Sequence, residues 1–338
     1  MAPGVKMANW KDYTLGVHQI ADDVWAYLQP DGSWGWNNTA LLISDGESLL
    51  VDTTIDLTTT QRMLAEMRSI CHLASVDSVF LTHWHVDHVH GISAPELMHS
   101  EIIASQICAD YLAKLPPAAW LAAIAGLEED AKKQMAHLLN DQFDFSGLRY
   151  VQPTRTFERE LTIEVGNKKV QAIEAKPCHT RSDTIVHIPH AGVVHMGDLV
   201  RARHHIGLQF PSMQNLMDIC QKAISLNAKT YVTGHGPLMD HSDMVAAMQY
   251  LHFIQDRAKR SHDAGRSMHE AFDDLLKNLG PYSHYTGLEG LFFTTRMMYA
   301  EFSGDSQDHA RKDYPAYLAM QWKLRSTLRD RYPELFRK

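Results

Sequence analysis

The 338-residue sequence predicts an α/β fold followed by a helical C-terminal extension. Three observations lead to this prediction. Short apolar segments bounded by turn residues recur as far as residue 233. Segments with helical periodicity lie between them, and after residue 243 only the helical pattern continues. We therefore expect one α/β domain over residues 15–242 and a helical extension over residues 243–338.

The first third of the chain has mainly strand character. Apolar and polar residues alternate in short runs, and turn signals such as Asp45-Gly46 separate them. An aromatic segment containing Trp34 and Trp36 follows the turn at residues 31–33. The elements expected here are strands at residues 17–20, 24–28, 39–43, 48–51 and 76–81 and a helix at residues 57–67.

Residues 95–144 are predicted to be mostly helical, because Pro116-Pro117 precedes a stretch rich in Ala, Leu, Glu and Lys at residues 118–139. Strand patterns return after this stretch. We expect strands at residues 150–151, 159–165, 169–172, 184–188, 193–196 and 230–233 and a helix at residues 214–226. Within the extension, helices are expected at residues 244–262, 268–279, 288–302 and 314–331.

Composition excludes several classes of protein. The net charge of −8 gives no basic field for nucleic acid, so no nucleic-acid partner is expected. Four cysteines without a C-x-x-C pair indicate neither a disulfide framework nor a thiolate zinc finger. The N-terminal residues lack the apolar core of a signal peptide, and no apolar run is long enough for a membrane span. We expect a cytoplasmic protein that acts on a small molecule and does not bind a membrane.

A cluster of metal-binding residue types follows the strand expected at residues 76–81. His83, His85, Asp87 and His88 lie within six residues of sequence. Imidazole and carboxylate are ligands that Zn²⁺ and Fe²⁺ accept readily. In an extended segment His83 and His85 point to the same side, and a following turn can direct Asp87 and His88 to a second point. The spacing therefore suggests two neighbouring metal ions.

This H-x-H-x-D-H run resembles the signature of the metallo-β-lactamase superfamily, which has an αββα sandwich fold. Further ligand-type residues follow in the family's order, each next to a predicted strand: His179, Asp198 and His235. Asp52, at the end of the strand at residues 48–51, matches another acidic position of the superfamily. The resemblance covers about residues 15–240 and is nearest to the branch of glyoxalase II and the lactonases.

The resemblance implies how the ligands are shared. It places His83, His85 and His179 on one metal ion. It places Asp87, His88 and His235 on the other, with Asp198 bridging both. Asp52 would orient a ligand histidine. The structural alternative, a closed four-coordinate zinc site, is usually rich in thiolates, and this ligand set is not.

The implied activity is that of a binuclear zinc-dependent hydrolase, with two Zn²⁺ per chain and Fe or Mn as alternative metals. A metal-bridging hydroxide would attack a carboxylic ester, thioester, lactone or β-lactam. Asp87 and Asp198 are the expected catalytic residues. Three alternatives stay open: a phosphate or sulfate ester hydrolase, a mononuclear iron oxygenase of the same fold, and a non-catalytic metal-binding or interaction protein.

Five residues are candidates for contact with the substrate. Trp34 and Trp36 would form an apolar wall over the metals or, alternatively, pack in the interior. Arg201 would hold a substrate carboxylate or is an ordinary surface arginine. His204 and His205 would line the pocket or form a solvated loop pair. The extension would act as a lid, as the interface of a homodimer, or as a second substrate-binding layer.

Overall fold

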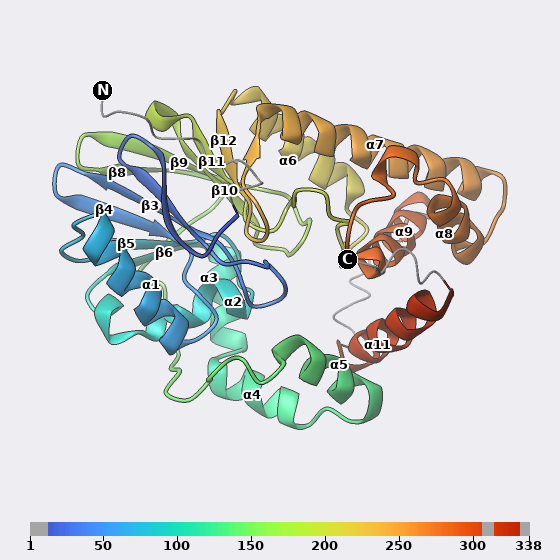
Figure 1. Cartoon of the computed structure of the whole chain (residues 1–338), viewed down its shortest axis with the longest axis horizontal. Coiled ribbons are helices and arrows are strands. Elements are labelled where there is room, and N and C mark those ends of the chain that lie inside the picture. The colour runs from blue at the N-terminus through green and yellow to red at the C-terminus, as the bar shows by residue number, and fades with distance from the viewer. Residues whose placement is uncertain (1–12, 306–313, 332–338) are drawn as a thin grey trace.

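Two β-sheets pack face to face with helices on both outer faces, in a computed structural model that describes residues 13–305 and 314–331 (Figure 1). The first sheet has the strand order β1-β2-β3-β4-β5-β6-β7. Its strands are β1 Gly16–Ala21, β2 Val24–Leu28, β3 Thr39–Ser44, β4 Glu47–Val51, β5 Ser78–Leu81, β6 Glu101–Ser105 and β7 Arg155–Phe157. Strands β1 to β4 pair antiparallel, and β4 to β7 pair parallel.

The second sheet has the order β13-β12-β11-β10-β9-β8. Its strands are β8 Glu160–Val165, β9 Lys168–Glu174, β10 Thr184–Ile188, β11 Val193–His195, β12 Thr230–Val232 and β13 Met239–Asp240. Apolar side chains from both sheets form the layer between them, including Leu42 and Phe80 of the first sheet and Val186 and Val232 of the second. Burial of these side chains away from water holds the two sheets together. The αββα arrangement confirms the fold class predicted from the sequence.

Ten α-helices are described. They are α1 Leu57–Ile70, α2 Val86–Val89, α3 Gln106–Lys114, α4 Pro117–Ala125, α5 Glu129–Leu139, α6 Met213–Ser225, α7 His241–Asp263, α8 Met268–Lys277, α9 Leu288–Phe302 and α11 Tyr314–Arg331. Helices α1 and α3 share a core with the outer face of the first sheet. Short 3₁₀ segments lie at His90–Ser93, Pro95–Leu97, Pro189–Ala191 and Gly280–Tyr282.

The helices of the C-terminal extension do not stand apart from the α/β part. One apolar cluster joins Leu216 of α6 and Tyr231 of β12 to Leu251 of α7, Leu275 of α8 and Phe293 of α9. Helix α11 joins this cluster through Leu328 and also packs on α5 through a smaller cluster, and Figure 1 shows it lying between α9 and α5. The boundary at residues 242/243 stays a prediction, and α7 begins just before it.

Most predicted elements are confirmed, with three differences. The single helix expected at residues 118–139 is two helices, α4 and α5, separated at Gly126-Leu127. Residues 150–151 form no strand. Strands β6, β7 and β13 and the short helix α2 were not predicted. Strand β6 is a short buried strand between parallel neighbours and lacks the alternation of a half-exposed strand.

The sheet topology brings several loops to one edge of the sandwich. Strands β4 and β5 are parallel neighbours in one sheet, and β11 and β12 are parallel neighbours in the other. The loops at their carboxyl ends therefore open on the same side of each sheet. A backbone hydrogen bond of 2.9 Å from Thr184 N–H to Thr82 O joins the two sheets at this edge.

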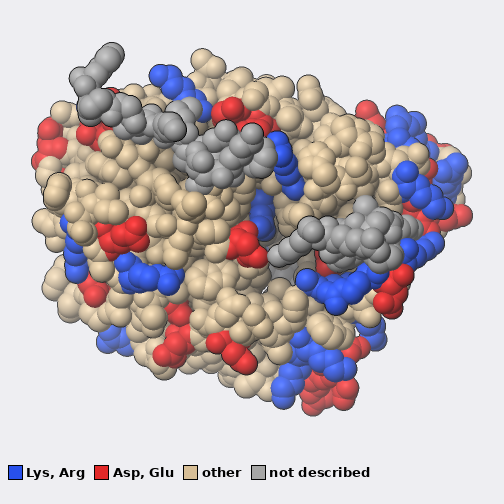
Figure 2. Space-filling model, viewed as in Figure 1, with Lys and Arg blue, Asp and Glu red and all other residues tan. Residues whose placement is uncertain are grey.

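Figure 2 shows acidic and basic side chains interspersed over the face of the molecule in view. None of the helices in the described residues is long and apolar enough to cross a membrane.

Candidate metal centre

The residues expected to bind metal lie in four loops at this edge of the sandwich. His83 and His85 follow β5, and the short helix α2 adds Asp87 and His88. His179 lies between β9 and β10, Asp198 follows β11, and His235 follows β12. Strand ends thus deliver all seven side chains to one place.

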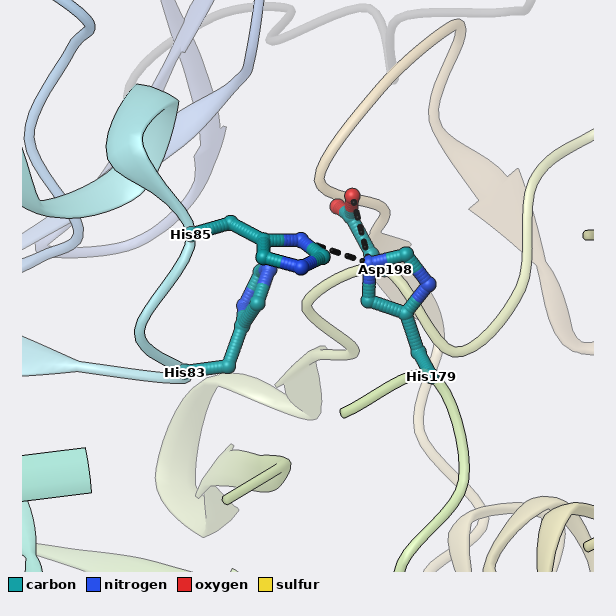
Figure 3. A group of neighbouring side chains, drawn as sticks. All are labelled: His83, His85, His179 and Asp198. Atoms are coloured by element: carbon teal, nitrogen blue, oxygen red, sulfur yellow. Dashed lines mark hydrogen bonds and ion pairs between the residues drawn. The ribbon is translucent and has the colours of Figure 1, made fainter. Parts of the chain in front are cut away.

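The seven side chains form two neighbouring groups. The first consists of His83, His85, His179 and Asp198, and the second of Asp87, His88 and His235. Within each group, one ligand atom of each residue lies within 4.8 Å of those of the others. Figure 3 shows the rings of His85 and His179 pointing toward each other, with His83 and the Asp198 carboxylate beside them. The resemblance implied the same division of the five histidines and Asp87, with Asp198 shared between the two groups.

The Asp198 carboxylate faces both groups. Its Oδ1 lies 3.3 Å from His88 Nε2. Its Oδ2 lies 3.5 Å from His179 Nε2 and 3.4 Å from His235 Nε2. Asp87 belongs to the second group alone, with its Oδ2 3.1 Å from His235 Nε2. One carboxylate therefore stands between the groups, as a bridging ligand must.

The donor atoms fit divalent cations. His83 Nε2, His88 Nε2 and Asp198 Oδ1 are buried without a hydrogen-bond partner in the described part of the chain. Buried polar atoms without partners are costly, and metal ions bound in the two groups would satisfy all three. His85 Nδ1 and His179 Nε2 lie 2.9 Å apart, so two imidazole nitrogens converge on one point. Five imidazoles and two carboxylates suit a borderline cation such as Zn²⁺.

Asp52 holds His88 and the start of the histidine loop. This residue has a left-handed backbone with φ 64°, a conformation that Asp adopts more readily than most residues. Its Oδ2 lies 2.8 Å from His88 Nδ1 and accepts a bond of 2.8 Å from Thr82 Oγ1, while its Oδ1 accepts the Thr82 N–H at 2.8 Å. A proton on His88 Nδ1 leaves the lone pair of Nε2 directed into the cluster.

We expect Asp52→Asn to weaken metal binding without unfolding the protein. The amide can no longer accept all three hydrogen bonds, so the orientation of His88 becomes less defined. Partners of this kind are typically worth about 10- to 100-fold in metal affinity or activity. Zinc titration and a thermal melt of both proteins measure this. An unchanged zinc affinity would contradict the role given to Asp52.

Burial and neighbouring charges determine the protonation states of the side chains in the cluster. Burial lowers the pKa of His83 well below its ordinary value and that of His85 to about 3, so both rings are neutral and can bind metal. Burial acts in the same direction on His235, but Asp198 and Asp87 raise its pKa to about 9. Burial alone would raise the pKa of Asp87, yet His88 and His235 hold it below its ordinary value. Asp87 is therefore ionised at neutral pH, and the carboxylates favour positive charge beside them.

The aromatic loop supports two ligands through its backbone. The Gly35 N–H donates to Asp87 Oδ2 at 3.3 Å, and His235 Nδ1 lies 3.1 Å from the Trp36 carbonyl oxygen. The rings of Trp34 and Trp36 pack on Phe143, with centroids 6.4 and 5.0 Å away. Neither Trp lines the described cavity at the metal cluster. Both Trp side chains are half-buried rather than interior, so a contact with the substrate stays a prediction.

Two supporting features escaped the sequence analysis. Asn38 Nδ2 donates to the carbonyl oxygens of Thr233 and Gly236 at 2.9 and 2.7 Å, which ties the aromatic loop to the segment carrying His235. Gly234 lies so close to Asp198 that a Cβ atom there would overlap Asp198 Oδ1. Two sequence features could have indicated these contacts. They are the pair Asn37-Asn38 after the aromatic segment and Gly234 before His235.

A cavity of about 140 Å³ opens on the cluster. Its lining includes His179, Asp198 and His235 together with Arg201 and His204. Arg201 is half-buried and forms no ion pair with any residue that the structure describes. Burial lowers the pKa of its guanidinium, which as an arginine remains charged. The cavity therefore combines the candidate metal ligands with one guanidinium that has no ion-pair partner among the described residues.

The adjacent histidines of this loop have different environments. His204 Nδ1 lies 2.9 Å from Thr286 Oγ1, and burial lowers the pKa of His204 well below its ordinary value. His205 is fully buried, and its Nδ1 lies 2.7 Å from the Tyr250 hydroxyl. His204 therefore lines the cavity, while His205 neither lines it nor lies in solvent. The two do not form the solvated pair that was one of the expectations.

Comparisons with known proteins point to one family. A sequence profile of the metallo-beta-lactamase superfamily matches residues 33–235. A solved metallo-beta-lactamase from Pontibacter korlensis is 19% identical, with a TM-score of 0.53 over 70% of this chain and 99% of its own. The DIM-1 metallo-beta-lactamase is 17% identical, with a TM-score of 0.52 over 71% of this chain and 97% of its own. No curated protein matches the sequence.

A further structural likeness extends into the helical region. The stereoselective inverting sec-alkylsulfatase Pisa1 from Pseudomonas sp. is 12% identical, with a TM-score of 0.66. The match covers 89% of this chain, which is more than the α/β part alone, and 52% of the sulfatase. The chain thus spans about half the length of that enzyme, and at this identity the likeness concerns the fold.

Proposed function

The chain belongs to the metallo-beta-lactamase superfamily and is a metal-dependent hydrolase, and we propose that it binds two divalent cations, zinc in the first instance, and hydrolyses a small anionic ester, thioester, lactone or lactam. The position of the Asp198 carboxylate between two groups of ligand atoms carries this proposal. Metal ions bound there would activate a water molecule and polarise the bond under attack.

The side chains have distinct parts in this reaction. His83, His85 and His179 would hold one cation and His88, His235 and Asp87 the other. Asp198 would be shared between them. Asp87 is ionised at neutral pH, and its Oδ2 accepts the Gly35 N–H at 3.3 Å. We therefore propose that Asp87 would accept the proton that the attacking water loses. Asp52 and the Trp36 carbonyl group fix the ring orientations of His88 and His235.

Arg201 is the proposed anchor for an anionic group of the substrate. Its guanidinium lines the cavity at the metal cluster without an ion-pair partner among the described residues. A carboxylate or sulfate there would gain two parallel hydrogen bonds to a cation. This contact would select small anions that carry the scissile bond next to the charged group.

We expect Arg201→Met to raise KM for an anionic ester about tenfold and to leave kcat within about threefold. The matched substrates are 4-nitrophenyl hydrogen succinate, which is anionic, and 4-nitrophenyl acetate, which is neutral. The neutral ester should show no such change. Arg68→Met is the control, because Arg68 is exposed on α1 and does not line this cavity. Equal effects of Arg201→Met on both esters would contradict the anchor.

Sulfate ester hydrolysis is a second candidate. The likeness to the sec-alkylsulfatase extends beyond the α/β part, and a guanidinium binds sulfate as well as carboxylate. A panel on the zinc-loaded protein separates the candidates: 4-nitrophenyl acetate, an acyl thioester, a γ-lactone, a chromogenic cephalosporin, 4-nitrophenyl sulfate and 2-octyl sulfate. Turnover of an acyl substrate that a chelator abolishes supports the first proposal. Turnover of sulfates alone replaces it with the second, and inertness toward the whole panel contradicts both.

A further inference from the structure

A second cavity adjoins the one at the metal cluster, and we call it the side cavity. It has a volume of about 130 Å³ and shares four wall residues with the first cavity. The shared residues are Val200, Arg201, His204 and Ile206. The remaining walls come from β13, α7 and the segment at residues 284–285. The side cavity therefore lies next to the cavity at the metal site, on the side of the helical extension.

The wall between the cavities is held in place by the extension. The His205 N–H donates to Thr286 O at 2.8 Å, and the Thr286 N–H donates to Arg203 O at 3.1 Å. The His204 ring bonds Thr286 Oγ1 at 2.9 Å. Gly287 has φ 80°, and a Cβ atom there would overlap the His204 ring. His204 is thus held in a fixed position in the lining that the two cavities share.

The inner surface of the side cavity is apolar. Met239, Tyr250 and Leu251 are buried, and Ala246 and Ala247 on α7 add small side chains beside them. The Tyr250 hydroxyl lies 2.7 Å from His205 Nδ1 and is hydrogen-bonded to it. A ligand in the side cavity would therefore contact the ring of Tyr250 and not its hydroxyl.

Apart from Arg201, which lines both cavities, the polar groups of the side cavity are either engaged in other contacts or exposed. Asp243 accepts the Asp240 N–H at 3.1 Å in the capping box of α7. Arg203 and His284 are exposed. An apolar ligand group could therefore enter between the exposed polar residues and reach the buried apolar surface. The Asp243 carboxylate would keep its hydrogen bond to the Asp240 N–H.

We propose that the side cavity binds the apolar part of the substrate. The reactive bond would lie at the metal cluster, the anionic group against Arg201, and a short aliphatic or aromatic group past His204 on Ala247 and Tyr250. This inference rests on the proposed function and defines its substrate class as amphiphilic anions. It makes the C-terminal extension a part of the substrate site.

Calorimetric binding of straight-chain alkanoates to the zinc-loaded protein tests the proposal. Acetate, butanoate, hexanoate and octanoate carry the same anionic group and differ only in chain length. We expect Kd to fall roughly threefold for each methylene group that enters the side cavity, and to level off when the cavity is full. Ala247→Phe should abolish this gradient by filling the cavity. Gln249→Phe, at an exposed position of the same helix, should preserve it.

The same gradient in Ala247→Phe as in the parent protein, or no gradient at all, would overturn the proposal. If Ala247→Phe does not fold, Tyr285→Ala enlarges the same cavity and should extend the gradient to longer chains; an unchanged gradient there would also overturn it. The substrate panel reports separately on the proposed function. Turnover without a chain-length gradient removes only the side-cavity inference, whereas a gradient without turnover removes only the hydrolase proposal.

Discussion

Replacing Asp198 with Ala is expected to lower kcat/KM by at least about a thousandfold and to reduce bound metal below two ions per chain. The carboxylate contacts His179 of one ligand group and His88 and His235 of the other, so the substitution removes a ligand from both. Five imidazoles and a single carboxylate would remain, which weakens the attraction for a second cation. Steady-state kinetics and plasma mass spectrometry of the purified variant measure the two effects.

The matched control for this variant is Asp218→Ala. Asp218 is an exposed residue of α6 whose carboxylate accepts a hydrogen bond from Gln214 at 2.8 Å. It should keep both metal ions and its activity. If Asp198→Ala retained two metal ions and more than a tenth of the parent activity, Asp198 would not be the bridging ligand.

Gly234→Ala is expected to reduce activity about a hundredfold, because displacement of a reacting group by about 1 Å can cost that much. A Cβ atom at Gly234 would overlap Asp198 Oδ1 and lie 3.0 Å from His88 Cε1, so the ligand carboxylate or the strand end must move. The measurement is kcat/KM on the best substrate of the panel, together with zinc affinity.

Gly126→Ala separates this effect from a general effect of adding a methyl group. Gly126 has φ −80°, and a Cβ atom there would make only ordinary contacts at 3.5 Å or more. This control should behave as the parent protein does. Parent-like kinetics in Gly234→Ala would show that the crowding around Asp198 does not matter for the reaction.

The candidate metal ligands could be predicted from the sequence because they lie in short motifs next to strands. His83 and His85 are two residues apart after β5, and the strand periodicity already places them on one side. Asp198 and His235 each follow a short apolar strand. The resemblance to a known family supplied the order and the αββα fold, which local patterns alone do not determine.

The substrate side of the site could not be predicted in the same way. Trp34 and Trp36 pack on Phe143, a contact between segments far apart in the chain that local sequence does not reveal. His204 and His205 are adjacent and of the same type, yet one lines the cavity and the other is buried against Tyr250 of the extension. These environments depend on tertiary packing, not on periodicity.

The extension was expected to be a lid, a dimer interface or a second substrate-binding layer. It shares one apolar core with α6 and β12, and its Thr286 holds the backbone of the loop that carries His204. The choice among the three roles stays a prediction, and the side cavity is the proposal for the substrate-binding layer. A homodimer and the absence of a nucleic-acid partner stay predictions.

A calorimetric zinc titration of the metal-stripped protein tests the binuclear centre directly. Two groups of ligand atoms, with Asp198 between them, predict a stoichiometry of two zinc ions per chain. A stoichiometry of one, or no binding, would contradict the binuclear centre on which the proposed hydrolysis depends.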